Sequence, residues 1–304
     1  MDLIIIGLGQ FGSALAQMYK RQGRRVHKII GPQTKVTLTK SEVSKSIILL
    51  CVPTQSLSEV LEQRVALLST AFGVVSAAKG LVRKTGQTAT EYLRSENSSI
   101  REVFALSGPS FASEIKKKQP TALVLAGENE TPLNSTIKIL GTSQVRLYKS
   151  LDPLGVELCG ALKNVYAIAA GVSAGLRFGD NTRAALNTRA LAEMSRITKA
   201  LGAHPFTVFG LAGVGDLFLT CSSQQSRNFQ FGFGLARGKT QKSLFRKLGT
   251  VEGAWTAASA RKVCRKHGLR TPLIDAVSDM LEGRLLPKDA IKSLMVRQVR
   301  HEFE

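Results

Sequence analysis

The 304-residue sequence has few of the features that mark secreted, metal-binding or membrane proteins. Its four cysteines are far apart and form no C-x-x-C pair, so we expect reduced cysteines packed in the core rather than disulfides or zinc ligands. No apolar run approaches the roughly 18–20 residues of a membrane span. Only Met1 and Asp2 precede the first apolar strand, which leaves no room for a secretory leader. These absences predict a cytoplasmic protein with no metal site and no membrane span.

Acidic and aromatic residues are also scarce. The chain has 42 Lys and Arg against 22 Asp and Glu, a formal net charge of +20, and only 6% aromatic residues. The excess positive charge is spread along the sequence, and residues 116–118 form its only tight run. Proteins that bind single-stranded nucleic acid use aromatic stacking platforms, which this composition does not offer. We therefore expect a basic surface that attracts anionic metabolites in preference to a nucleic-acid interface.

The first pattern that the chain does contain is a glycine-rich turn between a strand and a helix. Residues 3–6 are an apolar strand, residues 7–12 are Gly-Leu-Gly-Gln-Phe-Gly, and residues 13–21 form an amphipathic helical pattern that ends at Gly23. Glycines in a G-x-G-x-x-G turn let the backbone approach a pyrophosphate, and the helix N-terminus favours that anion. The context favours a dinucleotide site over a plain tight turn.

The second strand, residues 25–30, bears on the choice of cofactor. An Asp or Glu at its end would accept hydrogen bonds from the ribose 2′-hydroxyl of NAD. The sequence has none there, and Lys35 or Arg25 is instead available to a 2′-phosphate. We expect NADP(H) to be preferred over NAD(H).

Further apolar runs predict the rest of a buried parallel sheet. They are residues 47–52, 73–78, 103–106, 121–125 and 145–148, with a helix over 132–140. Ligands of such sheets gather at the carboxyl ends of the strands, where Lys79, Gly108 and Ser110 lie. From Asp152-Pro153 onward the patterns are helical. The predicted fold is α/β, with a Rossmann-type doubly wound sheet in residues 1–150 and an all-α domain in residues 151–304.

The helical half carries a lysine inside an apolar segment. Residues 154–176 are rich in small apolar residues, yet they contain Lys163. Its amine either reaches water along its aliphatic stem or faces a cleft, where burial and a neighbouring positive charge would lower its pKa enough for proton exchange. None of the four histidines has an obvious acidic partner, so lysine is the leading candidate base.

A glycine-rich stretch and a basic segment follow. Asp216 lies in residues 210–220 and is suited to orient Lys163 or balance its charge. Arg227, flanked by Ser226 and Asn228, has the forked donors that bind phosphate. Each of these residues also has an ordinary interpretation as a cap, a turn or a surface charge.

Taken together, the motifs resemble those of bacterial NAD(P)-dependent glycerol-3-phosphate dehydrogenases over nearly the whole chain. The matching segments, in the family's order, are residues 7–12, 78–80, 107–112, 160–164, 213–217 with 220–221, 225–228 and 251–253. The resemblance implies reversible NAD(P)H-linked reduction of dihydroxyacetone phosphate to sn-glycerol 3-phosphate, a precursor of phospholipids. It also implies an active site in a cleft between the two domains, in which Lys163 exchanges the proton at the C2 oxygen.

The same resemblance assigns the site residues. The catalytic set is Lys163, Lys79, Asp216 and Thr220. The substrate-binding set is Lys79, Gly108, Ser110, Lys163, Asn164, Asp216, Ser226, Arg227 and Asn228. The cofactor-binding set is Gly7, Gly9, Gln10, Phe11, Gly12, Lys79, Ala112, Arg227, Val251 and Glu252.

One departure from the family leaves alternatives open. Residues 31–46 form only a short link where family members usually have a longer stretch beside the adenosine. A related hydroxyacid dehydrogenase, or a homologue without turnover that binds nucleotide or nucleic acid, therefore remains an alternative. A homodimer is compatible with the sequence, which does not itself determine the oligomeric state.

Overall fold

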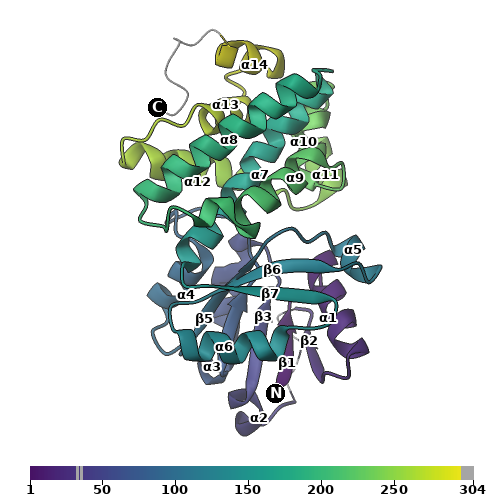
Figure 1. Ribbon diagram of the computed structural model, residues 1–304, viewed down its shortest axis with the longest axis vertical. Coiled ribbons are helices and arrows are strands. Elements are labelled where there is room, and N and C mark those ends of the chain that lie inside the picture. The colour runs from purple at the N-terminus through teal and green to yellow at the C-terminus, as the bar shows by residue number, and fades with distance from the viewer. Residues whose placement is uncertain (32–33, 35–36, 296–304) are drawn as a thin grey trace. The chain divides into compact units, whose positions relative to one another are not determined.

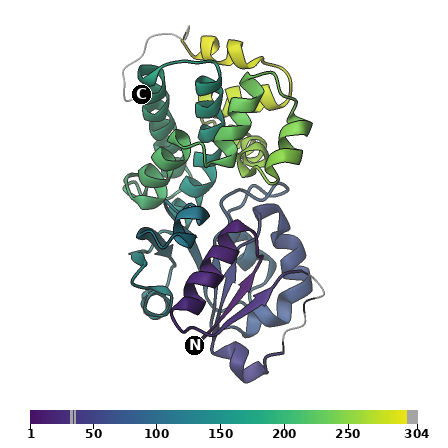
Figure 2. The same ribbon diagram turned by 90° about the vertical axis from the view of Figure 1, so that its right-hand side faces the viewer.

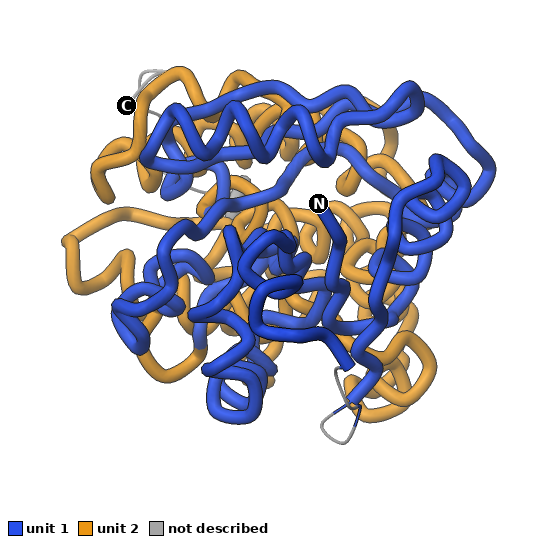
Figure 3. Tube along the Cα trace, turned by 90° about the horizontal axis from the view of Figure 1, so that it is seen from below, with its two compact units in different colours: residues 1–82, 87–157 blue, residues 83–86, 158–304 orange. Residues whose placement is uncertain are grey.

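The computed structural model describes residues 1–31, 34 and 37–295. Within them the chain forms two compact units. Unit 1 comprises residues 1–82 and 87–157, and unit 2 comprises residues 83–86 and 158–304 (Figure 3). Lys35, which we predicted beside a 2′-phosphate, lies outside the described residues.

Unit 1 is built on a seven-stranded sheet in the order β2-β1-β3-β4-β5-β6-β7 (Figure 1). Strands β1 to β5 are parallel, whereas β6 runs antiparallel to β5 and parallel to β7. This confirms the predicted Rossmann-type sheet. The strands are β1 (Asp2–Ile6), β2 (Val26–Ile29), β3 (Ser46–Leu50), β4 (Gly73–Ser76), β5 (Val103–Ser107), β6 (Thr121–Ala126) and β7 (Val145–Ser150).

Helices cover both faces of this sheet. Alternate residues of a strand point to opposite faces, so Ile4 and Ile6 pack with α2, α3 and α4, whereas Leu3 and Ile5 pack with α1, α5 and α6. Figure 2 shows α1, in purple, and the blue helices on opposite sides of the strands. The helices are α1 (Gln10–Arg21), α2 (Lys40–Ser44), α3 (Leu57–Thr70), α4 (Ala89–Glu96), α5 (Ala112–Lys116) and α6 (Glu130–Leu140). Continuous apolar strands are required because both faces are buried.

The link between β2 and β3 contains a short helix that we did not expect. Helix α2 begins with a capping box, in which the Thr39 side chain accepts from the Glu42 backbone N–H and the Glu42 side chain accepts from the Thr39 backbone N–H. Arg64 of α3 donates hydrogen bonds to the carbonyl oxygens of Gly31 and Thr34, at 3.1 and 3.0 Å. The described part of the link is therefore held against α3.

The regular elements in the described part of unit 2 are all helices, as predicted, and the first of them, α7, begins in unit 1. Helix α7 begins at Pro153, and the Asp152 carboxylate accepts a hydrogen bond from the Gly155 N–H at 2.9 Å. None of the described helices is both long and apolar enough to cross a membrane. The helices are α7 (Pro153–Gly175), α8 (Asp180–Ala200), η2 (Thr207–Phe209), η3 (Leu211–Gly215), α9 (Asp216–Ser222), α10 (Arg227–Ala236), α11 (Gln241–Leu248), α12 (Glu252–Lys266), α13 (Pro272–Leu281) and α14 (Pro287–Met295).

Helices α7 and α10 cross with their backbones in contact. A Cβ added at Gly232 would lie 2.0 Å from the Ile168 carbonyl oxygen, and one added at Gly171 would lie 2.0 Å from the Phe229 carbonyl oxygen. Neither position has room for a side chain, so these glycines set the distance between the two helices.

Two buried glutamates each accept hydrogen bonds from the first turn of another helix. In unit 1, Glu157 of α7 accepts from the Thr90 N–H of α4 at 3.0 Å. In unit 2, Glu193 of α8 accepts from the Leu273 and Ile274 N–H groups of α13 at 3.0 and 3.1 Å. Burial raises the pKa of each carboxyl to about 7, although these hydrogen bonds oppose the shift.

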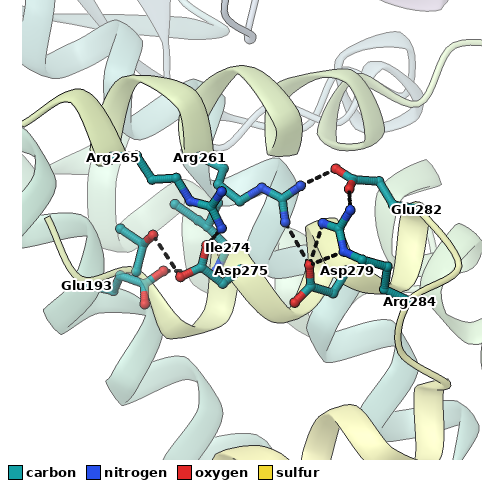
Figure 4. A network of polar contacts seen from close by, with 9 residues as sticks. Glu193, Arg261, Arg265, Ile274, Asp275, Asp279, Glu282 and Arg284 are labelled. Carbon is teal, nitrogen blue, oxygen red and sulfur yellow. Dashed lines mark hydrogen bonds and ion pairs between the residues drawn. The ribbon is translucent and has the colours of Figure 1, made fainter. Parts of the chain in front are cut away.

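An ion-pair network continues from α13 to the chain that follows it (Figure 4). Arg261 of α12 is buried and donates to Asp279 at 2.7 Å and to Glu282. Arg284 contacts the same two carboxylates. The network ties α12 to the end of α13.

The short segment 83–86 belongs to unit 2 through contacts with α12. The Arg83 guanidinium lies 5.3 Å from the ring centroid of Trp255, the only tryptophan. A Cβ added at Gly86 would lie 2.5 Å from a methyl group of Val263.

Candidate functional site

The glycine-rich turn of unit 1 contains Gly7, Gly9 and Gly12, whose backbone conformations and surroundings differ. Gly7 has a φ of +90°, and a Cβ there would meet the Cys51 carbonyl oxygen at 2.7 Å. A Cβ at Gly12 would lie 2.0 Å from the Gly7 carbonyl oxygen. A Cβ at Gly9 would meet no atom within 4 Å, so packing within the chain does not explain that glycine. Gly9 is the N-cap of α1, whose first N–H groups have no partner within the helix. The turn therefore offers an open approach to an anion.

The end of the second strand offers no carboxylate to a ribose. Ile30 occupies that position and is 74% exposed. Arg25, one of the two basic residues predicted to meet a 2′-phosphate, lies 3.3 Å from the Asp2 carboxylate. That contact is exposed, so it constrains the guanidinium only weakly.

Three predicted residues of unit 1 come together where β4 and β5 end. The half-buried Lys79 donates a hydrogen bond from Nζ to the Gly108 carbonyl oxygen at 2.9 Å. The Ser110 hydroxyl donates to the same oxygen at 3.0 Å. Gly108 has a φ of +126°, a conformation that side chains with a Cβ rarely adopt. Ala112 opens the next helix, α5.

In unit 2, Lys163 is buried among polar partners. Its Nζ lies 2.7 Å from Asp216 Oδ1 and 2.8 Å from Thr220 Oγ1, and the Thr220 hydroxyl donates to Asp216 Oδ1 at 3.2 Å. Only 6% of Lys163 is exposed, so the interpretation in which its amine reaches water is wrong. The neighbour found is the Asp216 carboxylate, the group that we expected to orient Lys163 or balance its charge. Asp216 therefore stabilises the ammonium form, which can donate a proton.

The local fold explains why Asp216 and Thr220 meet the amine together. They lie four residues apart on α9 and so share one face of that helix. The π-helical turn η3 precedes α9, and a Cβ at Gly213 would lie 2.0 Å from the Val208 carbonyl oxygen. The glycine-rich stretch thus lets the chain turn tightly before the carboxylate.

Two predicted asparagines contact each other. Asn228 Nδ2 donates to Asn164 Oδ1 at 2.8 Å, and Asn228 Oδ1 accepts from the Gly253 N–H at 2.9 Å. Val251 is the buried N-cap of α12, and Glu252 is the first residue of that helix. Gly253 was not among the predicted site residues, although its place directly after Glu252 at a helix start could have indicated it.

Ser226 and Arg227 have different roles at the start of α10. The Ser226 hydroxyl caps the helix by accepting from the Phe229 N–H at 3.2 Å. Arg227 is exposed and forms no ion pair with any described residue. Its guanidinium is thus available to an anion at a helix N-terminus.

Two family models match the chain. One, described as the C-terminus of NAD-dependent glycerol-3-phosphate dehydrogenase, matches residues 152–292, and one described as the N-terminus matches residues 32–132. A protein of Lawsonia intracellularis called glycerol-3-phosphate dehydrogenase [NAD(P)+] is 37% identical, over 99% of this chain and 95% of its own. One of the same name from Synechococcus sp. (strain RCC307) is 39% identical over 302 residues, which cover 98% of both chains.

A solved structure has the same fold. The crystal structure of glycerol-3-phosphate dehydrogenase from Coxiella burnetii superposes with a TM-score of 0.88 at 31% identity, and the match covers 97% of this chain and 99% of that one. The predicted family is therefore confirmed. The Synechococcus relative is about as long as this chain, so the overall length is shared by another member.

Proposed function

Because the chain belongs to the NAD-dependent glycerol-3-phosphate dehydrogenase family, we propose that it reduces dihydroxyacetone phosphate to sn-glycerol 3-phosphate, reversibly and with NAD(P)H. The observation that carries the proposal is the buried contact of Lys163 with Asp216 and Thr220. When bound, NAD(P)H would supply the hydride to C2, and the role of the chain itself is to supply a proton to the C2 oxygen. One carbonyl is thereby reduced, and NAD(P)+ and the alcohol are the products.

Lys163 is the proposed proton donor. Asp216 favours its ammonium form in a nearly water-free environment, and Thr220 fixes the direction of Nζ. In the oxidative direction the same amine accepts the proton from the hydroxyl. General acid catalysis of this kind contributes roughly 10²–10⁴-fold in rate.

The phosphate of the substrate is assigned to the start of α10. Arg227 provides forked donors, which suit a phosphate better than a point charge does. Ser226 and Asn228 use their side chains inside the fold, so we assign their contribution to backbone N–H groups of the first helical turn. Lys79, Gly108, Ser110 and Asn164 complete the proposed substrate set.

The cofactor's pyrophosphate is assigned to the glycine-rich turn, because the open side of Gly9 and the first N–H groups of α1 suit a diphosphate. The proposed contacts there are Gly7, Gly9, Gln10, Phe11 and Gly12, and those elsewhere are Lys79, Ala112, Arg227, Val251 and Glu252. The lack of a carboxylate after β2 supports a preference for NADP(H). We assign most of these cofactor contacts to the dinucleotide-binding domain, residues 1–150, and the catalytic amine and the phosphate anchor to the helical domain, residues 151–304.

The test is the loss of nicotinamide absorbance with dihydroxyacetone phosphate, run in parallel with NADPH and NADH. We compare the wild type with Lys163→Ala and with Lys199→Ala, a matched change of an exposed lysine on α8. Turnover should fall at least a hundredfold in Lys163→Ala only, and calorimetric NADPH affinity should stay within about twofold. Undiminished turnover in Lys163→Ala would exclude the assigned role, and no turnover by folded wild type would exclude the function.

A further inference from the structure

We propose that Asn228 is a positioning residue that fixes the start of α12 against the helix that carries Lys163. The inference rests on the proposed function, because it concerns how the proposed site is held together. Its basis is a chain of hydrogen bonds that joins α12, α10 and α7, which we call the asparagine bridge and define as Gly253, Asn228, Asn164 and Gly160.

The bridge runs in one direction. The Gly253 N–H donates to Asn228 Oδ1 at 2.9 Å, Asn228 Nδ2 donates to Asn164 Oδ1 at 2.8 Å, and Asn164 Nδ2 donates to the Gly160 carbonyl oxygen at 3.3 Å. Asn228 is 8% exposed and Asn164 is 5% exposed, so solvent competes little for these groups.

The two ends of the bridge determine the orientation of both amides. A backbone N–H can only donate, so Asn228 must present its oxygen to Gly253. Its amide nitrogen then donates to Asn164, which must accept with its amide oxygen. The amide nitrogen of Asn164 therefore donates to the Gly160 carbonyl oxygen. Neither amide can rotate by 180° without placing two donors or two acceptors against each other.

The packing at Gly253 supports the same role. A Cβ there would lie 2.3 Å from the Asn164 carbonyl oxygen and 2.9 Å from Asn228 Oδ1. The first turn of α12 therefore rests directly on the backbone of α7. Gly253 is the second residue of α12, and its N–H belongs to the helical turn that has no partner within the helix. The Asn228 side chain acts as a cap supplied from another helix.

The bridge joins three segments that we assign to substrate and cofactor. Asn164 follows Lys163, Asn228 follows Arg227, and Gly253 follows Glu252 in the sequence. Loss of one neutral amide should therefore disturb the catalytic amine and the cofactor contacts together. The Asn228 amide is thereby assigned to holding these three segments together.

The first experiment compares Asn228→Ala with Asn187→Ala, a matched change of a buried asparagine on α8 outside the bridge. We measure NADP+ affinity by calorimetry, kcat and KM with dihydroxyacetone phosphate and NADPH, and the thermal midpoint. We expect Asn228→Ala to weaken NADP+ binding at least tenfold and to lower kcat at least tenfold. Asn187→Ala should change only the thermal midpoint.

If Asn228→Ala lowers the thermal midpoint and leaves both NADP+ affinity and kcat at wild-type values, the bridge is only structural and the proposal is overturned. The NADP+ titration does not depend on the reaction. A wild type that binds NADP+ without reducing dihydroxyacetone phosphate would refute the proposed function, and the affinity comparison would still decide on the bridge.

A second variant keeps the proposal testable if Asn228→Ala does not fold. Asn228→Asp retains the acceptor for Gly253 and places an oxygen against Asn164 Oδ1. A protonated carboxyl can donate to that oxygen as the amide does. The deficit in NADP+ affinity relative to wild type should therefore shrink at least threefold from pH 8 to pH 5.5, and a deficit that does not change with pH would contradict the proposal.

Discussion

Neutralising Glu193 should change how the free energy of unfolding of unit 2 depends on pH. The burial of this carboxyl determines the direction of the change. The carboxyl is 1% exposed, and burial raises its pKa from 4.5 to about 7 against the opposing hydrogen bonds from Leu273 and Ile274. Arg196 lowers this pKa and Asp275 raises it, so the shift belongs to the folded state. Glu193→Gln removes the titration, and its amide NH2 cannot accept one of the two backbone hydrogen bonds, a loss that does not depend on pH.

The sign follows from proton binding. Between pH 4.5 and pH 7 the folded state holds the Glu193 proton and the unfolded state releases it, so stability falls as pH rises through this window. The contribution is complete below pH 4.5 and is lost above pH 7. At about 1.4 kcal/mol per pKa unit, the shift corresponds to about 3 kcal/mol. The free energy of unfolding of Glu193→Gln, measured relative to that of wild type, should therefore rise by about 3 kcal/mol as the pH is raised from 4.5 to 8.

The assay is urea unfolding followed by the fluorescence of Trp255, which lies in unit 2 with Glu193. Other groups titrate in both proteins, and they cancel in the difference between variant and wild type. Asp180→Asn, which neutralises an exposed carboxylate in the same unit, is the control and should show no such gain. A difference between Glu193→Gln and wild type that stays constant from pH 4.5 to pH 8 would refute the reasoning.

Three further predictions concern the site and its support. Asp216→Asn removes the carboxylate from the buried amine and should lower kcat at least about a hundredfold. The KM for dihydroxyacetone phosphate is measured alongside kcat for comparison. An unchanged kcat would contradict the role of Asp216 beside Lys163. Arg227→Ala should raise that KM by the equivalent of about 2–5 kcal/mol, and equal values before and after would exclude a phosphate contact. Gly232→Ala, whose Cβ would lie 2.0 Å from the Ile168 carbonyl oxygen, should cost about 3 kcal/mol in urea unfolding. Gly179→Ala, which would meet no atom within 4 Å, should be nearly neutral, and equal losses in the two would count against the tight crossing.

The sheet was predictable because burial on both faces leaves a strong signal. Residues 47–52 are almost all apolar, and they overlap β3 (Ser46–Leu50). The direction of each strand in the sheet was not predictable in the same way, because an apolar run is the same whether its strand is parallel or antiparallel to its neighbour. The antiparallel β6 was therefore not evident. The helix α2 escaped notice although Thr39 and Glu42 have the spacing of a capping box.

The candidate site was predictable where a residue type is costly in its context. A lysine at position 163 of an apolar helix requires an explanation, and its contact with Asp216 provides one. Neutral contacts leave no such signal. Nothing in the sequence pairs Asn228 with Gly253, because single hydrogen bonds between helices have no periodicity.

The path of the chain has a consequence for limited proteolysis and for dividing the protein into fragments. The chain passes between the units at three places, after residues 82, 86 and 157, so no single cut separates them. A fragment that stops at residue 150 loses Glu157, the carboxylate that caps α4. A fragment that begins at residue 158 lacks the Arg83 guanidinium beside Trp255. When chimeras of two relatives are made by exchanging the two halves, residues 83–86 should therefore come from the same parent protein as α12.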